Sequence, residues 1–169
     1  MKPLVLALVA SICLGALAQE ARIPLVQPRP STLILERVTP INQHHAEFKG
    51  AIWVSGTLYA TWSQPSSSPV ELRLVPDGAS RKRLPHFARY GVTWIEVKNG
   101  SEALKMSFSA SEYKRVLARE GSMAHVTGAW QISGYAVGIE CDAPYAYATI
   151  IKTKIPGHKL AGIKRPETC

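Results

Sequence analysis

The chain has 169 residues, 46% of them hydrophobic and 19% charged, and its formal net charge is +8. This length supports one compact domain with a core of its own, and the apolar content excludes an intrinsically disordered chain. The basic charge favours contact with anionic polysaccharide, lipid headgroups or nucleic acid, although it also serves solubility alone.

Residues 1–18 are predicted to be a signal peptide. Lys2 gives a positive start, an almost wholly apolar run follows, and Ala16-Leu17-Ala18 has the spacing of a cleavage site. The apolar run falls short of the roughly 20 residues that span a bilayer. A lipoprotein anchor at Cys13 is the alternative, and the bulky Ile12 before it disfavours that reading. We therefore expect a periplasmic or secreted protein without stable membrane insertion.

Residues 19–50 are predicted to form an extended leader. Three prolines and no hydrophobic periodicity mark its first part. Ser31 to Val38 is a short β-prone run and a candidate edge strand, whereas Pro40 to Gly50 is polar and predicts a loop.

A domain is predicted over residues 51–154, and it begins with three strand patterns, at 51–63, 70–76 and 90–98. In the first of them, alternation places Ile52, Val54, Leu58, Ala60 and Trp62 on one face. Gly56, in the middle of this strand, suits a bulge or a sharp bend. Asp77-Gly78 opens a loop, and Asn99-Gly100 predicts a turn rather than a glycosylation site.

The segment from Phe108 to Gly121 carries the one strong helix signal. Ser109 and Glu112 have the spacing of a capping box, and Phe108 and Tyr113 have that of a hydrophobic staple. Gly121 stands where a helix C-cap belongs. Residues 105–108 are predicted as a short extension before this helix.

Strand patterns return after the helix, at residues 123–132, 135–140 and 145–154. The inward face of the first should carry Ala124, Val126, Gly128, Trp130 and Ile132. Residues 155–169 are predicted to form an irregular basic tail.

Three strands, one helix and two strands is the order of a five-stranded OB barrel with its helix between the third and fourth strands. A β-sandwich is the alternative. The phrases WVSGTL (Trp53 to Leu58) and HVTGAW (His125 to Trp130) look like strand centres common in that fold. On these residues the chain resembles small exported OB-fold proteins of Gram-negative bacteria, many without assigned function. The OB fold binds oligonucleotides or oligosaccharides on the face of its second and third strands.

The candidate ligand-binding residues combine aromatic rings for stacking with cations for anionic groups. They are Trp53, Tyr59 and Arg73 on the predicted outer face, with Arg81, Lys82, Arg83 and Arg89 beside it. This set suits an anionic polymer, either an oligosaccharide or a nucleic acid. The alternative is that the leader or residues 31–38 cover the two rings and that the arginines lie on a solvated loop.

Cys141 and Cys169 are the two cysteines left after signal cleavage, and we predict a disulfide between them. Such a bridge would stabilise the fold by about 3–4 kcal/mol on the loop-entropy model. The alternative is a buried thiol at Cys141 and a loose or intermolecular Cys169.

No metal or cofactor is expected. His44 and His45 are adjacent in an extended segment and point apart, so they do not readily chelate one ion. The chain lacks the sequence motifs of hydrolases and nucleotide-binding enzymes, so no catalytic residue is predicted. A non-enzymatic binding module is the leading hypothesis. An inhibitor- or immunity-like module that binds an envelope protein is the second, and a cryptic hydrolase using His86 or His125 is the third.

Overall fold

The computed structural model describes residues 23–39, 44–61, 70–118, 123–155 and 161–164. The predicted signal peptide, Trp62, Gly121 and Cys169 lie outside this part of the chain. The protein is mainly β, as predicted. In chain order its elements are β1 (Leu25–Val26), β2 (Ile34–Val38), β3 (His45–Thr61), β4 (Glu71–Pro76), α1 (Gly78–Arg81), β5 (His86–Phe87), β6 (Ile95–Val97), α2 (Gly100–Ser107), α3 (Ala110–Leu117), β7 (Met123–Glu140), β8 (Ala143–Lys154) and β9 (Ala161–Lys164).

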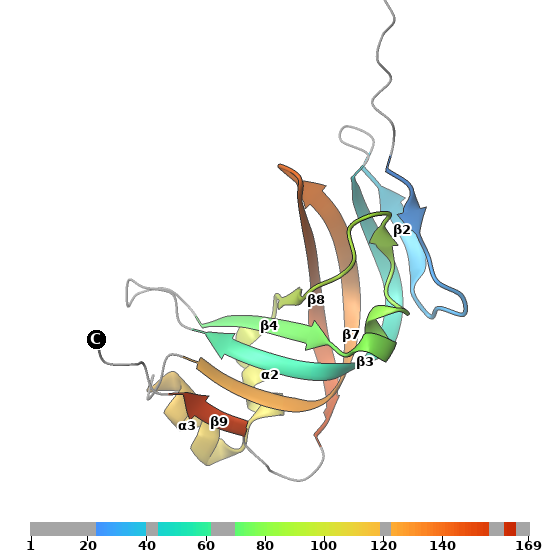
Figure 1. The fold of residues 1–169 in the computed structure, drawn as a ribbon. Helices are drawn as coiled ribbons and strands as arrows, with labels where there is room; N and C mark the ends of the chain where they lie inside the picture. The colour runs from blue at the N-terminus through green and yellow to red at the C-terminus, as the bar shows by residue number, and fades with distance from the viewer. Residues whose placement is uncertain (1–22, 40–43, 62–69, 119–122, 156–160, 165–169) are drawn as a thin grey trace, which may run out of the picture.

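The main sheet has seven strands in the order β2-β3-β4-β6-β8-β7-β9, and β3 pairs with β7 as well. The pairing of β6 with β8 is parallel, and the other pairings are antiparallel. β1 and β5 form a separate two-stranded sheet. The long strands β3 and β7 therefore form the spine of the molecule, and Figure 1 shows both of them bending along their length.

Two glycines allow the long strands to bend where they face each other. The register between β3 and β7 shifts between Phe48 and Ala51, where Gly50 has a φ of +98°. In β7, Gly134 has a φ of +56°, and the register with β8 shifts there. Both angles favour glycine. The bulge predicted at Gly56 is wrong, because the register continues unbroken through that residue.

The core lies where alternation predicts it. The inward side chains of β3 from Ile52 to Ala60 and those of Leu72 and Leu74 of β4 are buried. Of the residues predicted inward on β7, Ala124, Val126, Trp130 and Ile132 are buried, and Gly128 is half-buried. Two polar groups in this core have partners. The Trp130 indole N–H donates to Ser107 Oγ at 3.0 Å, and the Tyr135 hydroxyl donates to the Pro85 carbonyl at 2.8 Å. Burial raises the pKa of Tyr135, so its phenol stays neutral.

The predicted capping box at the start of α3 is confirmed. Ser109 Oγ accepts from the Glu112 N–H at 3.4 Å, and the Glu112 carboxylate accepts from the Ser109 N–H at 2.8 Å. No helix in the described part of the chain is long and apolar enough to cross a membrane.

The predictions around α2 are wrong. Residues 100–107 form a helix instead of following a hairpin turn, and Asn99 is its N-cap residue. The Asn99 amide donates to the Ile150 carbonyl at 2.8 Å and accepts from the Ile150 N–H at 3.0 Å. This side chain thereby extends the contact between the end of β6 and β8 beyond the last paired residues, Val97 and Ala148.

Several predicted boundaries also change. Residues 45–50 belong to β3 rather than to a loop, and β6 covers only residues 95–97 of the predicted 90–98. The strands predicted at 123–132 and 135–140 are one strand, β7, and residues 161–164 of the predicted irregular tail form β9. A single turn of helix, α1, replaces part of the loop after Asp77, whose carboxylate accepts from the Ser80 N–H. The candidate edge strand is confirmed as β2, which pairs with β3.

Candidate functional site

The predicted ligand-binding residues divide into two groups along β3. Trp53 and Tyr59 are six positions apart on this strand, which corresponds to about 20 Å. β2 pairs with residues 46–49 of β3, so it does not cover either ring. The predicted set is therefore not one compact site.

The first group is the basic patch, defined as Trp53, Arg81, Lys82 and Arg83. Arg83 donates to the Trp53 carbonyl at 2.8 Å, and Arg81 donates to the Pro76 carbonyl at 3.3 Å. The ammonium of Lys154 lies 4.8 Å from the centre of the Trp53 ring. Two of its three predicted cations thus bind the backbone. Arg89 is exposed beyond β5, with a φ of +74°.

The second group is Tyr59 and Arg73, which face each other across β3 and β4. The Tyr59 ring is half-buried and stacks on His125, with 5.5 Å between ring centres. Arg73 instead lies against Trp94, with its guanidinium 5.2 Å from the centre of that ring. Arg73 therefore shares a face of the sheet with Tyr59 and also contributes to a second surface.

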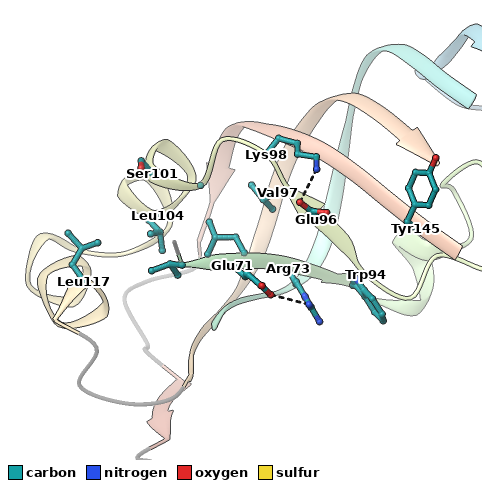
Figure 2. Close-up of a pocket in the computed structure, with 13 residues that line it drawn as sticks. Glu71, Arg73, Trp94, Glu96, Val97, Lys98, Ser101, Leu104, Leu117 and Tyr145 are labelled. Carbon is teal, nitrogen blue, oxygen red and sulfur yellow. Dashed lines mark hydrogen bonds and ion pairs between the residues drawn. The ribbon is translucent and has the colours of Figure 1, made fainter. Parts of the chain in front are cut away.

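That surface is a cavity of about 880 Å³ across β4, β6 and the start of β8. Figure 2 shows its lining, with charged side chains on the strands, the rings of Trp94 and Tyr145 at one end, and α2 and α3 at the other. We call it the aromatic groove and define it by Glu71, Arg73, Trp94, Glu96, Lys98 and Tyr145. The strand register brings these elements together, because Arg73 of β4 faces Glu96 of β6, and Glu96 faces Tyr147 of β8. Tyr145 lies two positions before Tyr147 on the same strand.

Each cation of the groove has a carboxylate partner. Arg73 binds Glu71 at 3.1 Å, and Lys98 binds Glu96 at 2.8 Å. The Lys98 ammonium also lies 4.8 Å from the centre of the Tyr147 ring. These four charged side chains are between 46% and 58% exposed. Exposed pairs of this kind contribute roughly 0–1 kcal/mol, so a ligand can compete for either cation.

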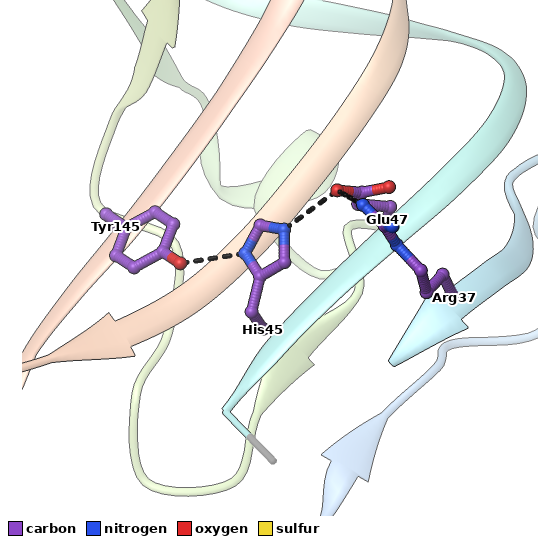
Figure 3. A network of polar contacts seen from close by, with 4 residues as sticks. All are labelled: Arg37, His45, Glu47 and Tyr145. Carbon is purple, nitrogen blue, oxygen red and sulfur yellow. Dashed lines mark hydrogen bonds and ion pairs between the residues drawn. The ribbon is translucent and has the colours of Figure 1, made fainter. Parts of the chain in front are cut away.

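A chain of hydrogen bonds runs from Arg37 through Glu47 and His45 to the Tyr145 hydroxyl (Figure 3). Arg37 of β2 donates to Glu47 Oε1 at 2.8 Å, and His45 Nε2 lies 3.1 Å from the same oxygen. His45 Nδ1 lies 2.7 Å from the Tyr145 hydroxyl. Hydrogen bonds from Arg37 and then His45 lower the pKa of Glu47, so this carboxylate is ionised and accepts only. In its neutral form His45 would therefore carry its proton on Nε2 and accept from the Tyr145 hydroxyl on Nδ1.

Gly138 makes this contact possible. It lies on β7, between His45 on one neighbouring strand and Tyr145 on the other. A Cβ at this position would overlap the Tyr145 ring and the His44 carbonyl. Because Gly138 has no side chain, the Tyr145 ring can cross over β7 and reach His45.

The network positions Tyr145 rather than activating it as a nucleophile. Burial, followed by the charges of Tyr147, Glu140 and Glu47, raises the Tyr145 pKa, which keeps the phenol neutral. The histidines proposed for a hydrolase have other contacts, since His86 bonds the Leu84 carbonyl and His125 stacks on Tyr59. The hydrolase hypothesis thus gains no support from either residue.

Adjacent histidines point apart, as predicted. His44 packs edge-on against Phe87, while His45 bonds Tyr145. Among the described residues, no group of three His, Cys, Asp or Glu side chains is placed to hold a metal ion.

Cys141 is exposed and lies in a tight turn between β7 and β8. Its φ of +48° and the +61° of Asp142 are those of a two-residue hairpin turn. The thiol is free within the described part of the chain, which does not include Cys169. The disulfide stays a prediction.

Sequence reasoning missed most of the groove and its support. The missed residues are Glu71, Trp94, Glu96, Lys98 and Tyr145 of the groove, and Arg37, His45, Glu47 and Tyr147 around it. A signal existed for two of them, because the alternation Tyr145-Ala146-Tyr147-Ala148 places both rings on one face of a strand whose alanines are buried. The His45–Tyr145 contact spans 100 positions, and no local pattern indicates it.

Comparison with known proteins gives no relative. No protein-family model, no curated protein and no solved structure matches this chain.

Proposed function

We propose that the domain is an OB-like barrel. The strand pairings support this assignment, because they lead from β3 through β4, β6, β8 and β7 back to β3. The one parallel pair joins the third and last strands of this circuit, and the helices α2 and α3 lie between the third and fourth. β4 and β6 are then the second and third strands, and the aromatic groove lies on the face that OB folds use for ligands.

We infer that the protein is an exported, non-enzymatic module that binds an anionic polymer along this groove. The observation that carries the proposal is the cavity itself, in which Arg73 lies against the Trp94 ring and Lys98 and Tyr145 belong to the same lining. Flat rings stack on sugars or bases, and the two cations supply partners for anionic groups. The cavity volume also falls within the range of ligand sites in proteins.

The charge of the groove favours an acidic oligosaccharide over a nucleic acid. Its two cations are matched by Glu71 and Glu96, so the four side chains sum to zero formal charge. A nucleic acid carries one negative charge per nucleotide and needs an excess of cations to neutralise it. A carboxylate of a uronic acid oligosaccharide can instead take the place of Glu71 or Glu96 as the partner of either cation.

Calorimetric titration with a uronic acid oligomer, such as oligogalacturonate, tests the proposal. Stacking on one ring contributes about 1–3 kcal/mol, so Trp94→Ala should weaken binding roughly 5- to 150-fold. Arg73→Ala should weaken it as well. The matched control is Lys82→Ala, an exposed cation of the basic patch, which should change the Kd by less than about twofold.

Two results would count against this assignment. An equal loss in Lys82→Ala would place the polymer on the basic patch instead. Tighter binding of oligo(dT), with an affinity that collapses as salt rises, would indicate a nucleic-acid site.

A second candidate function is binding to an envelope protein through β2. Within the described part of the chain this strand pairs only with β3, and all five of its residues are exposed. Three are apolar, and Ile34 is 57% exposed. An exposed apolar edge can accept another strand. Partner capture from an envelope extract that survives high salt and is lost in Leu35→Lys would favour this function.

A further inference from the structure

A second, smaller cavity of about 340 Å³ adjoins the aromatic groove. It lies between residues 90–94, which precede β6, and the first residues of β8. Its lining is dominated by aromatic and aliphatic side chains. These are Tyr90, Val92, Trp94, Val137, Pro144 and Tyr145, with Gly91, Ala143 and Ala146 as the small members.

The cavity exists because two chain segments diverge. β6 pairs with β8 only from Glu96 opposite Tyr147 onward, and residues 91–94 before it have no regular secondary structure. β8, by contrast, already pairs with β7 from Ala143. The small residues on both walls leave the resulting space unfilled.

The two cavities share a wall. Trp94 and Tyr145 line both of them, and Trp94 is 41% exposed. The Tyr145 hydroxyl contacts His45, and its ring fills the space that the missing side chain of Gly138 leaves. Both features fix the position of Tyr145 in this wall. A group in the small cavity would therefore touch the same two rings as a ligand in the groove. Charged side chains line only the groove, so the pair of cavities matches a ligand with a polar part and an apolar part.

We propose that the small cavity binds the hydrocarbon chain of an acylated saccharide whose sugar rings occupy the aromatic groove. This inference rests on the proposed function and names the ligand class more closely. Each methylene group buried in such a cavity should tighten binding about fourfold, and the gain should stop once the cavity is full. A chain-length series thus has a characteristic shape, with a steep rise followed by a plateau.

The test is calorimetric titration of the full chain with n-alkyl maltosides from ethyl to tetradecyl, each kept below its critical micelle concentration. We expect the Kd to fall about fourfold per methylene and then level off. An affinity that does not depend on chain length would overturn the inference. So would a gain that continues unchanged through tetradecyl, because it indicates an open apolar surface rather than a bounded cavity.

Substitutions of residues that line just one of the two cavities show which cavity binds the hydrocarbon chain. Ala143→Leu fills the small cavity from β8, and Gly91→Leu fills it from the opposite wall, where an added Cβ meets no atom within 4 Å. Both should bring the plateau to shorter chains. Arg73→Ala, on the groove alone, should weaken oligogalacturonate binding and leave the chain-length slope unchanged. A plateau that stays in place in both filled variants would overturn the assignment to this cavity.

The two proposals fail in different ways. Binding of oligogalacturonate without any chain-length dependence would leave the polymer site intact and remove the acyl site. A chain-length slope without oligogalacturonate binding would remove the proposed polymer function, and with it the acylated saccharide as the ligand.

Discussion

The aromatic groove and the basic patch use cations in opposite ways. In the groove, Arg73 and Lys98 lie beside rings and bind carboxylates of exposed neighbours. In the basic patch, Arg81 and Arg83 bind backbone carbonyls next to α1 and β3. The patch is the more conspicuous in sequence, because its three cations are consecutive. The groove, by contrast, is a cavity that Trp94 and Tyr145 line.

This contrast shows that a run of cations is weak information about a ligand site. A long cationic side chain can satisfy a carbonyl at the end of an element as well as an external anion. Two rings from segments distant in the sequence, beside replaceable ion pairs, are a more specific arrangement, and only the fold assembles them.

The largest difference between the two regions should come from their glycines. Gly138→Val forces a side chain into the space of the Tyr145 ring and the His44 carbonyl, and overpacking of this kind costs about 1–3 kcal/mol. Gly78→Ala, in α1 beside the basic patch, is the control, because its added Cβ would meet no atom within 4 Å. Urea unfolding measures both. Equal stability of the two variants would show that Tyr145 does not depend on the space over Gly138.

The next effect concerns the junction of β6 and β8 below the groove. Asn99→Ala removes both hydrogen bonds to Ile150 and leaves its backbone groups without a partner, at a cost of about 1–2 kcal/mol. Asn99→Asp keeps the acceptor for the Ile150 N–H and loses the donor, so its loss should be smaller. Urea unfolding of the two variants checks the order, and an Asn99→Ala protein as stable as the wild type would contradict it.

Elements with a local pattern could be predicted from the sequence. Alternation identified the buried side chains of β3, β4 and β7, and the spacing of Ser109 and Glu112 identified the start of α3. The first half of β3 was missed because its outward residues, such as His45 and Glu47, are polar and follow a proline, which suggests a loop. α2 was missed because Asn99-Gly100 is a strong turn signal, whereas here the Asn99 side chain pairs with a distant strand.

The candidate site was much less predictable than the fold. Arg73 is the one predicted residue that lines the groove. Its ring partner Trp94 belongs to an irregular segment, and Tyr145 comes from the last long strand, so their proximity depends on the parallel pairing of β6 with β8. Pairing between strands distant in sequence leaves no periodic trace, and sequence patterns therefore cannot specify it.

A smaller effect should separate the hydroxyl of Tyr145 from its ring. Tyr145→Phe removes the donor to His45 Nδ1 and retains the stacking surface, so stability should fall by about 1 kcal/mol. The ¹⁵N chemical shifts of His45 provide a second readout, because loss of this donor should change the Nδ1 resonance more than that of Nε2. An unchanged Nδ1 shift would contradict the assigned tautomer. Tyr147→Phe is the matched control on the same face.

The smallest expected effect is a dependence of the free energy of unfolding on pH, which comes from Glu47 rather than from the basic patch. The lowered pKa of Glu47 means that its ionised form is favoured in the folded protein, by Arg37 first and His45 second. Its contribution is therefore complete above the ordinary carboxyl pKa and is lost as pH falls through the lowered folded-state pKa. Solvent screens this pair, so the loss should be the smallest of the effects considered. Urea unfolding of Glu47→Gln should differ from the wild type at pH 7 and converge with it once the pH falls below the lowered pKa of Glu47. Arg37→Ala should reduce the stability difference between Glu47→Gln and its parent, because Arg37 is the main cause of the lowered Glu47 pKa. If Glu47→Gln loses as much stability in acid as the wild type does, the effect belongs to another carboxylate.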